Sequence, residues 1–309
     1  MKQRAFGGTG ISVSELSFGA SSLGGVFHDI DEAEGIRAVH AALDAGITYF
    51  DVAPAYGGTR AETVLGKALK GVPRDRYVLS TKVGKYTDPD GRDRLDYRAE
   101  RIRKEFASSL ARLGVDDVDI LYIHDIEYER GLQTEDALSE GLATVLALRD
   151  QGRTRAVGFG FYPVDLWRRV LSDYPVDAAL IHNHYGLHDT RLTTLLPFAE
   201  TKGVGVVNAS PFASGLLTER GPAEWHPASA EDRAVAQAAA ALCREHGTSI
   251  ERLALQFAAH GAQAATLMFS TSKPEAVLRN VAWAAEKPDA ALVSAVRDVL
   301  APISDRDWF

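Results

Sequence analysis

The sequence is poor in cysteine and has no excess of positive charge. Its single cysteine, Cys243, excludes an internal disulfide, so folding does not need an oxidising compartment. Acidic residues outnumber basic ones by 42 to 34, and the net charge of −8 argues against binding to nucleic acid or to anionic membranes. No apolar run could span a bilayer, and the first ten residues contain no apolar signal region. We therefore expect a cytoplasmic protein, a monomer or small homo-oligomer, whose partner is a small molecule.

Short apolar runs typical of strands alternate with segments of helical periodicity. The runs span residues 16–19, 48–52, 77–83, 118–124, 155–160, 178–183, 204–210 and 265–270. Strands buried on both faces that alternate with helices indicate parallel βαβ units, and eight such units fit an α/β (β/α)8 TIM barrel. A doubly wound open sheet is the alternative. Its dinucleotide-binding form needs G-x-G-x-x-G after the first strand, and FGASSLGG does not fit that spacing.

Glycines and flanking segments refine this prediction. Several helical segments end at a glycine, which favours the left-handed conformation of a helix C-terminus: Gly46, Gly71, Gly114, Gly152, Gly203 and Gly247. Residues 4–16 predict an N-terminal β-hairpin that turns at Gly7 and Gly8, and residues 289–309 predict an extra C-terminal helix and a tail. No linker divides the chain, so we expect residues 1–309 to form one barrel domain.

Four polar residues lie at or just beyond the ends of successive predicted strands. Asp51 ends the second strand and Tyr56 follows it, Lys82 ends the third strand, and His124 ends the fourth. Each alone has an ordinary explanation, such as a structural ion pair, loop packing or a core histidine. At one barrel mouth they predict an acid–base site. The ammonium would lower the pKa of the tyrosine, the carboxylate would hold the ammonium, and the histidine would bind the substrate oxygen.

The motifs around these residues resemble those of the aldo-keto reductase superfamily. Asp51 and Tyr56 stand in FDVAPAYG, Lys82 in STKVG and His124 in LYIHD, in the order of the Asp-Tyr-Lys-His tetrad of that superfamily. The segments HDIEY, HNHYGLHD and GVGVVNASPFASGLLTERGPAEWHPAS are similar to those of the subgroup with L-galactose dehydrogenase and bacterial aldose 1-dehydrogenases. The resemblance implies an NAD(P)-dependent oxidoreductase that oxidises C1 of a sugar such as L-galactose, L-fucose or D-arabinose to a lactone.

Two other functions stay open at this stage. An NADPH-dependent reductase of aldehydes or ketones would use the same tetrad in the opposite direction. A non-enzymatic barrel, like the channel-associated subunits related to the superfamily, is disfavoured by the complete tetrad.

The resemblance also implies a cofactor site without a Rossmann motif. Asn183 matches the amide on the nicotinamide, residues 210–216 match the segment around the pyrophosphate, and residues 270–273 match the phosphate and ribose loop. The full set of expected cofactor contacts is Ala20, Ser21, Asp51, Asn183, Ser210, Pro211, Phe212, Ser214, Leu216, Ser270, Thr271, Ser272, Lys273, Arg279 and Asn280.

The sequence departs from the superfamily at the nicotinamide. Gly160 and Phe161 stand in place of a Ser-Asn pair, and Ala209 stands in place of a stacking aromatic residue. Phe161 or Tyr162 could pack there instead. Ala276 replaces a basic residue that many NADP-using members carry, so NAD is the expected cofactor.

NADP remains usable through Lys273 and Arg279, the nearby basic residues. Substrate contacts are expected from Tyr56 and His124, and from Trp225 and Trp308, for which simple packing is an equal alternative. His182 and His184 share a strand face, but no convincing set of further ligands accompanies them, so no metal site is expected.

Overall fold

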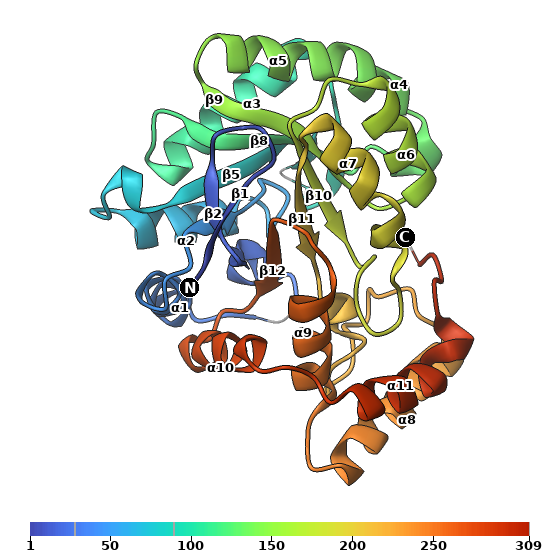
Figure 1. Ribbon diagram of the computed structural model, residues 1–309. Coiled ribbons are helices and arrows are strands. Elements are labelled where there is room, and N and C mark those ends of the chain that lie inside the picture. The colour runs from blue at the N-terminus through green and yellow to red at the C-terminus, as the bar shows by residue number, and fades with distance from the viewer. Residues whose placement is uncertain (28, 89, 309) are drawn as a thin grey trace.

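Eight parallel strands of the computed structural model close into a barrel within the residues that it describes, 1–27, 29–88 and 90–308 (Figure 1). Their order around the barrel is β10-β11-β12-β3-β4-β5-β8-β9. The strands are β3 (Leu16–Gly19), β4 (Tyr49–Asp51), β5 (Val78–Val83), β8 (Val118–His124), β9 (Thr154–Phe161), β10 (Ala178–His182), β11 (Gly205–Ala209) and β12 (Thr266–Ser270). Each corresponds to one of the predicted runs, which confirms the TIM barrel and rules out the open sheet.

The N-terminal hairpin lies across the end of the barrel where the strands begin, and it is the dark blue ribbon that crosses the middle of Figure 1. Its strands β1 (Gln3–Ala5) and β2 (Ser12–Ser14) pair antiparallel, as predicted. Phe6, Ile11 and Val13 of the hairpin are fully or almost fully buried and pack with the side chains that fill the barrel interior. Because this end is closed, the strand C-termini at the other end remain as the place for a site.

Helices surround the barrel and bury their apolar faces against the outer sides of the strands. They are α1 (Glu32–Asp44), α2 (Arg60–Leu69), α3 (Ala99–Leu113), α4 (Thr134–Asp136), which continues through a π-helical turn into α5 (Leu142–Asp150), α6 (Val164–Asp173), α7 (Leu196–Lys202), α9 (Ile250–Gly261) and α10 (Pro274–Ala285). Gly114 is one of the glycines predicted to end a helix. It has a left-handed φ of 71°, and its N–H donates to the Leu110 carbonyl at the C-terminus of α3. Among the described residues, no helix is long and apolar enough to cross a membrane.

The connection between β11 and β12 departs from the predicted (β/α)8 pattern, which has one helix in each unit. It holds two helices, α8 (Ala230–Glu245) and α9. Leu255 and Ala258 of α9 join the main core, while α8 packs with α11 (Ala290–Leu300) in a separate apolar cluster that also takes in Ile250 and Leu253 of α9. The two helices lie together at the lower right of Figure 1. The expected C-terminal helix is therefore present, and it has its own partner outside the ring.

A second hairpin, absent from the sequence-based expectations, follows β5. Strands β6 (Lys85–Thr87) and β7 (Asp93–Leu95) pair antiparallel, with Lys85 opposite Leu95.

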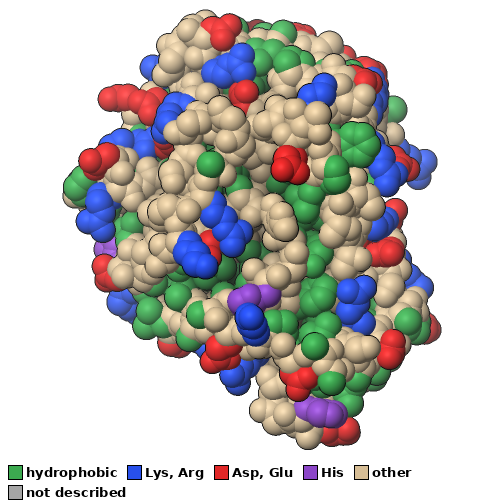
Figure 2. Space-filling view, viewed as in Figure 1, with side chains coloured by type: hydrophobic (Ala, Val, Ile, Leu, Met, Phe, Trp, Pro, Cys, Tyr) green, Lys and Arg blue, Asp and Glu red, His purple; other side chains and the backbone are tan. Residues whose placement is uncertain are grey.

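On the molecular face shown in Figure 2, positive and negative side chains are interspersed, and neither sign forms a broad patch there.

Candidate active site

Asp51 and Lys82 form a buried ion pair at the C-terminal ends of β4 and β5. Lys82 Nζ lies 2.5 Å from Asp51 Oδ2 and also donates to the Val52 carbonyl at 3.0 Å, while Ser80 Oγ donates to Asp51 Oδ1 at 2.6 Å. The side chains of Lys82 and Asp51 are only 1% and 3% exposed. Burial acts to lower the pKa of Lys82, but the charges of Asp51 and Tyr56 and the hydrogen bonds to both together raise the pKa, so the lysine is charged at neutral pH. The carboxylate in the core strand thus has the cationic partner that its burial requires.

Tyr56 follows β4 in its loop and lies beside this pair. Lys82 Nζ is 4.7 Å from the centre of the Tyr56 ring. Burial raises the pKa of Tyr56, and the charge of Lys82 opposes that rise without cancelling it. The expected net lowering of this pKa is therefore wrong, although Lys82 acts in the expected sense.

His124, at the end of β8, meets Tyr56 edge to face, with ring centres 5.7 Å apart. Its Nε2 is 3.5 Å from Asp125 Oδ1, and its buried Nδ1 finds no hydrogen-bond partner among the described residues. Burial lowers the pKa of His124 to about 3, so the ring is neutral at neutral pH. A neutral imidazole can hold a substrate oxygen by a hydrogen bond without adding a charge.

These side chains line a cavity of about 610 Å³ at the C-terminal mouth of the barrel, a volume typical of a small-molecule site. Two arcs of neighbouring strands supply its walls. Residues at or just after the C-terminal ends of β4, β5 and β8 form one arc, and those at or after the ends of β11, β12 and β3 form the other: Asp51, Tyr56, Lys82, Lys85, His124, Asp125 and Tyr128, then Ser210, Pro211, Phe212, Ser214, Ser270, Thr271, Ser21 and Ser22.

The two predicted substrate tryptophans have different surroundings. Trp225 lines the cavity and donates from Nε1 to the Val26 carbonyl at 3.1 Å, which connects the long β11–α8 loop to the loop after β3. Trp308 does not line the cavity. It stacks on His188 with ring centres 5.4 Å apart and donates to Asp232 Oδ2 at 3.2 Å. The structure therefore favours tail anchoring over substrate contact for Trp308.

Comparisons with known proteins agree with this geometry. The family model described as "Aldo/keto reductase family" matches residues 15–301. The chain belongs to the aldo/keto reductase family. It is 41% identical over 314 residues to L-galactose dehydrogenase of Arabidopsis thaliana, with 99% of this chain and 96% of the relative covered. It is 30% identical to D-threo-aldose 1-dehydrogenase of a Pseudomonas species, with 92% of this chain and 93% of the relative covered.

A solved structure agrees as well. The holo form of an aldo-keto reductase from Bacillus halodurans superposes with a TM-score of 0.78 at 26% identity and covers 100% of this chain and 98% of its own. This aldo/keto reductase is therefore an NAD(P)-dependent oxidoreductase.

The loop after β11 fits the diphosphate of such a cofactor. Ser210, Ala213 and Ser214 have φ of 64°, 49° and 54°, a left-handed conformation that costs non-glycine residues about 1–3 kcal/mol each. The backbone N–H groups of Ser210, Ala213 and Gly215 already donate to carbonyls of the protein, so the loop offers a diphosphate mainly its side-chain hydroxyls, of which those of Ser210 and Ser214 lie at the cavity wall. Strain concentrated in a cavity-lining loop is consistent with a ligand contact.

Serine hydroxyls face this loop across the same arc. Ser270 Oγ, at the end of β12, accepts from Ser21 Oγ at 3.0 Å and from the Ser22 backbone N–H at 3.0 Å. Ser21, Ser270 and Thr271 all line the cavity, as their expected cofactor role requires. The described residues therefore fit a dinucleotide in this aldo/keto reductase.

Other expected cofactor residues lie outside the cavity wall. Asn183 is buried at φ 64° and donates from Nδ2 to Ser214 Oγ at 3.1 Å, so it holds the loop. The remaining residues outside the wall are Ala20, Leu216, Ser272 and Asn280, which are buried, and Lys273 and Arg279, which are exposed. The Arg279 guanidinium sits 4.9 Å from the centre of the Trp283 ring.

The aromatic residues proposed to replace the nicotinamide clamp face elsewhere. Phe161 stacks on Trp167 with ring centres 3.9 Å apart, on the outer side of the barrel, and Tyr162 packs over His184 at 4.5 Å. Gly160 and Ala209 do line the cavity, and their small size leaves the floor open. The expectation that Phe161 or Tyr162 packs on the nicotinamide is not supported.

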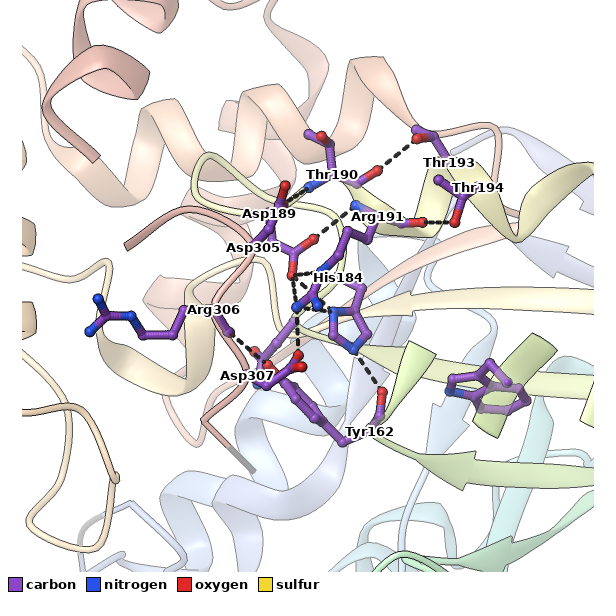
Figure 3. A network of polar contacts seen from close by, with 12 residues as sticks. Tyr162, His184, Asp189, Thr190, Arg191, Thr193, Thr194, Asp305, Arg306 and Asp307 are labelled. Carbon is purple, nitrogen blue, oxygen red and sulfur yellow. Dashed lines mark hydrogen bonds and ion pairs between the residues drawn. The ribbon is translucent and has the colours of Figure 1, made fainter. Parts of the chain in front are cut away.

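Tyr162 and His184 belong instead to a polar network that anchors the C-terminal tail (Figure 3). His184 bonds through Nδ1 to Asp189 Oδ2 at 2.9 Å and through Nε2 to the Tyr162 carbonyl at 2.7 Å. Arg191 joins Asp189 at 2.8 Å to Asp307 of the tail at 2.8 Å. His184 is thus committed to this network.

Sequence reasoning missed several charged cavity residues. Lys85, Asp93, Asp125 and Arg220 all line the wall, as does His182, which the sequence offered only as a metal candidate. Asp125 directly follows His124 in the motif LYIHD, a signal that could have identified it. Lys85 comes from the unexpected hairpin, and Arg220 is an exposed cation on the same loop as the strained residues.

Proposed function

We propose that this aldo/keto reductase oxidises the C1 hydroxyl of an aldose to a lactone, with NAD as the preferred cofactor. The observation that carries the proposal is the convergence of Tyr56, His124 and the Lys82–Asp51 pair on one cavity. The similarity to two relatives named as sugar dehydrogenases favours an aldose over a simple carbonyl compound.

In this proposal each side chain has a separate task. Tyr56, in its phenolate form, accepts the proton of the C1 hydroxyl. Lys82 stabilises that phenolate by its charge, and Asp51 keeps Lys82 charged and in place. Neutral His124 holds the C1 oxygen through a hydrogen bond.

The bound nicotinamide supplies the acceptor for the C1 hydride. Because burial raises the pKa of Tyr56, the phenolate forms at high pH, and sugar oxidation should accelerate as pH rises. The lysine and tyrosine titrate as a pair, so the profile reports both groups.

The preference for NAD is supported at the start of α10. Ala276 is buried and offers no charge to a 2′-phosphate, while exposed Lys273 and Arg279 could still provide some. A screen of L-galactose, L-fucose, D-arabinose and simple aldehydes with both cofactors tests the proposal. NAD-linked aldose oxidation supports it. NADPH-linked reduction of simple carbonyls without aldose oxidation would refute it.

A further inference from the structure

We infer that Asp125 and Asp93, held by Lys85, form a subsite that reads substrate hydroxyl groups and selects polyhydroxylated substrates. This inference rests on the proposed function for the location of the reacting carbon beside Tyr56. It adds residues outside the tetrad and gives them a task in specificity.

Lys85 organises the subsite from the short hairpin that follows β5. Its Nζ lies 2.8 Å from Asp125 Oδ2, 3.5 Å from Asp93 Oδ2, and 4.0 Å from the centre of the Tyr128 ring. The ammonium carries three hydrogens and has these three negative or electron-rich neighbours around it. Its donor capacity is therefore taken up by the protein, and its task is to hold two carboxylates at the cavity wall.

Both carboxylates line the cavity; Asp93 accepts from Thr87 Oγ1 at 2.8 Å and stays 46% exposed, while Asp125 keeps a freer oxygen. Asp125 uses Oδ2 for Lys85, and within the described part of the chain its Oδ1 has a 3.5 Å contact with His124 Nε2. Burial alone would raise the pKa of Asp125, but His124 and Lys85 lower it to about 2, so the group is ionised at neutral pH. An ionised carboxylate has about four acceptor sites and no hydrogen to donate. Hydroxyl groups are the ligands that match such a surface.

Backbone interactions fix Asp125 in an unusual conformation. Its φ is 52°, in the left-handed region, and its N–H donates to the Gly160 carbonyl at 2.9 Å. The buried Tyr97 hydroxyl donates to the carbonyls of His124 and Asp125 at 2.8 and 3.1 Å. A strained residue held by several bonds beside a cavity is expected where its side chain must be placed accurately.

The position of the subsite determines which hydroxyls it reads. Asp125 follows His124 directly in the chain, so its carboxylate lies beside the group that holds the reacting oxygen in the proposal. A substrate with hydroxyls near the reacting carbon can donate to Asp125 and Asp93. A substrate that lacks these hydroxyls leaves the Asp125 carboxylate, which is only 10% exposed, without a hydrogen-bond donor from the substrate. Such sites discriminate strongly against analogues that lack the hydroxyl.

Glyceraldehyde and propanal form a matched pair of substrates for the test, because both have three carbons and only the first has hydroxyls. The readout is the ratio of kcat/KM for glyceraldehyde over propanal in the direction of carbonyl reduction. The double variant Lys85→Met, Asp125→Asn removes both charges together, so that no unpaired charge is buried, and asparagine tolerates the left-handed conformation.

We expect the ratio to fall roughly 10- to 100-fold in the double variant, mainly through a higher KM for glyceraldehyde. The control is Glu32→Gln, Lys67→Met, which removes an exposed ion pair of 2.6 Å between α1 and α2 and should leave the ratio unchanged. A wild type without preference for glyceraldehyde, or a double variant with an unchanged ratio, would overturn the inference.

Two further measurements keep the result interpretable. If the double variant does not fold, Asp93→Asn alters a carboxylate that is 46% exposed, and the ratio should fall about threefold or more; an unchanged ratio overturns the inference. Aldose oxidation is measured on the same wild-type preparation. If the double variant loses the preference for glyceraldehyde but the wild type does not oxidise aldoses, the proposed function alone is refuted. If the wild type oxidises aldoses but the double variant keeps the same ratio, the subsite alone is refuted.

Discussion

Asp51→Asn isolates the buried charge on which the candidate active site depends. The substitution keeps the shape of the side chain and retains an oxygen for Ser80, but it removes the negative charge 2.5 Å from Lys82 Nζ. The Val52 carbonyl, at 3.0 Å, remains as a neutral acceptor for an ammonium that is 1% exposed. Removing one partner of a buried ion pair costs about 3–5 kcal/mol of unfolding free energy.

Urea unfolding at neutral pH measures this cost. We expect Asp51→Asn to lose about 3–5 kcal/mol and the double variant Asp51→Asn, Lys82→Met to recover at least about 1 kcal/mol of it. Glu32→Gln, at an exposed pair, serves as the control and should cost less than about 1 kcal/mol.

The pH dependence gives a second signature. Without Asp51, burial lowers the pKa of Lys82 below its unfolded value of about 10.4. The unfolded state then binds more protons than the folded state, so the stability deficit shrinks as pH rises toward about 10. A loss of less than about 1 kcal/mol, or a deficit independent of pH, would contradict the assigned ion pair.

Three other substitutions test separate parts of the molecule. Burial and the charge of Asp125 raise the pKa of Glu127 to about 8, so wild-type stability should fall as pH rises from about 4.5 through 8, and Glu127→Gln should flatten that fall in urea unfolding at several pH values. Lys273→Gln should weaken NADP more than NAD in fluorescence-quenching titrations, because a 2′-phosphate needs charged partners; equal losses would remove Lys273 from that role. Trp308→Ala should cost about 1–3 kcal/mol in thermal or urea unfolding without changing KM for the sugar, and a tenfold rise in KM would return Trp308 to the substrate pocket.

The strands were predictable because each barrel strand is buried on both faces and therefore forms a compact apolar run. Helix α9 was missed because it follows α8 with only a short break from His246 to Ser249, and the barrel unit was expected to contain one helix. Which of the two helices joins the main core depends on α11, far along the chain, with which α8 packs. Local periodicity carries no record of that partner.

In the candidate active site, too, some features were predictable from the sequence and others depend on the packed structure. Asp51, Tyr56, Lys82 and His124 were identifiable because topology alone brings strand ends together. The net pKa shift of Tyr56 was not, because desolvation depends on the packed surroundings rather than on the neighbour's charge. Lys85 was missed because its strand has three residues, too few to show an alternating pattern.

The most direct test of the account is aldose oxidation by wild type and Tyr56→Phe at saturating NAD, followed by the formation of reduced cofactor. Phenylalanine keeps the ring and removes only the hydroxyl that exchanges the proton. We expect turnover of L-galactose or a related aldose by the wild type, a fall of about 10²- to 10⁴-fold in kcat for Tyr56→Phe, and an unchanged dissociation constant for NAD by fluorescence quenching. Near-normal turnover by a folded, NAD-binding Tyr56→Phe variant would contradict the assignment of Tyr56 and, with it, the proposed mechanism.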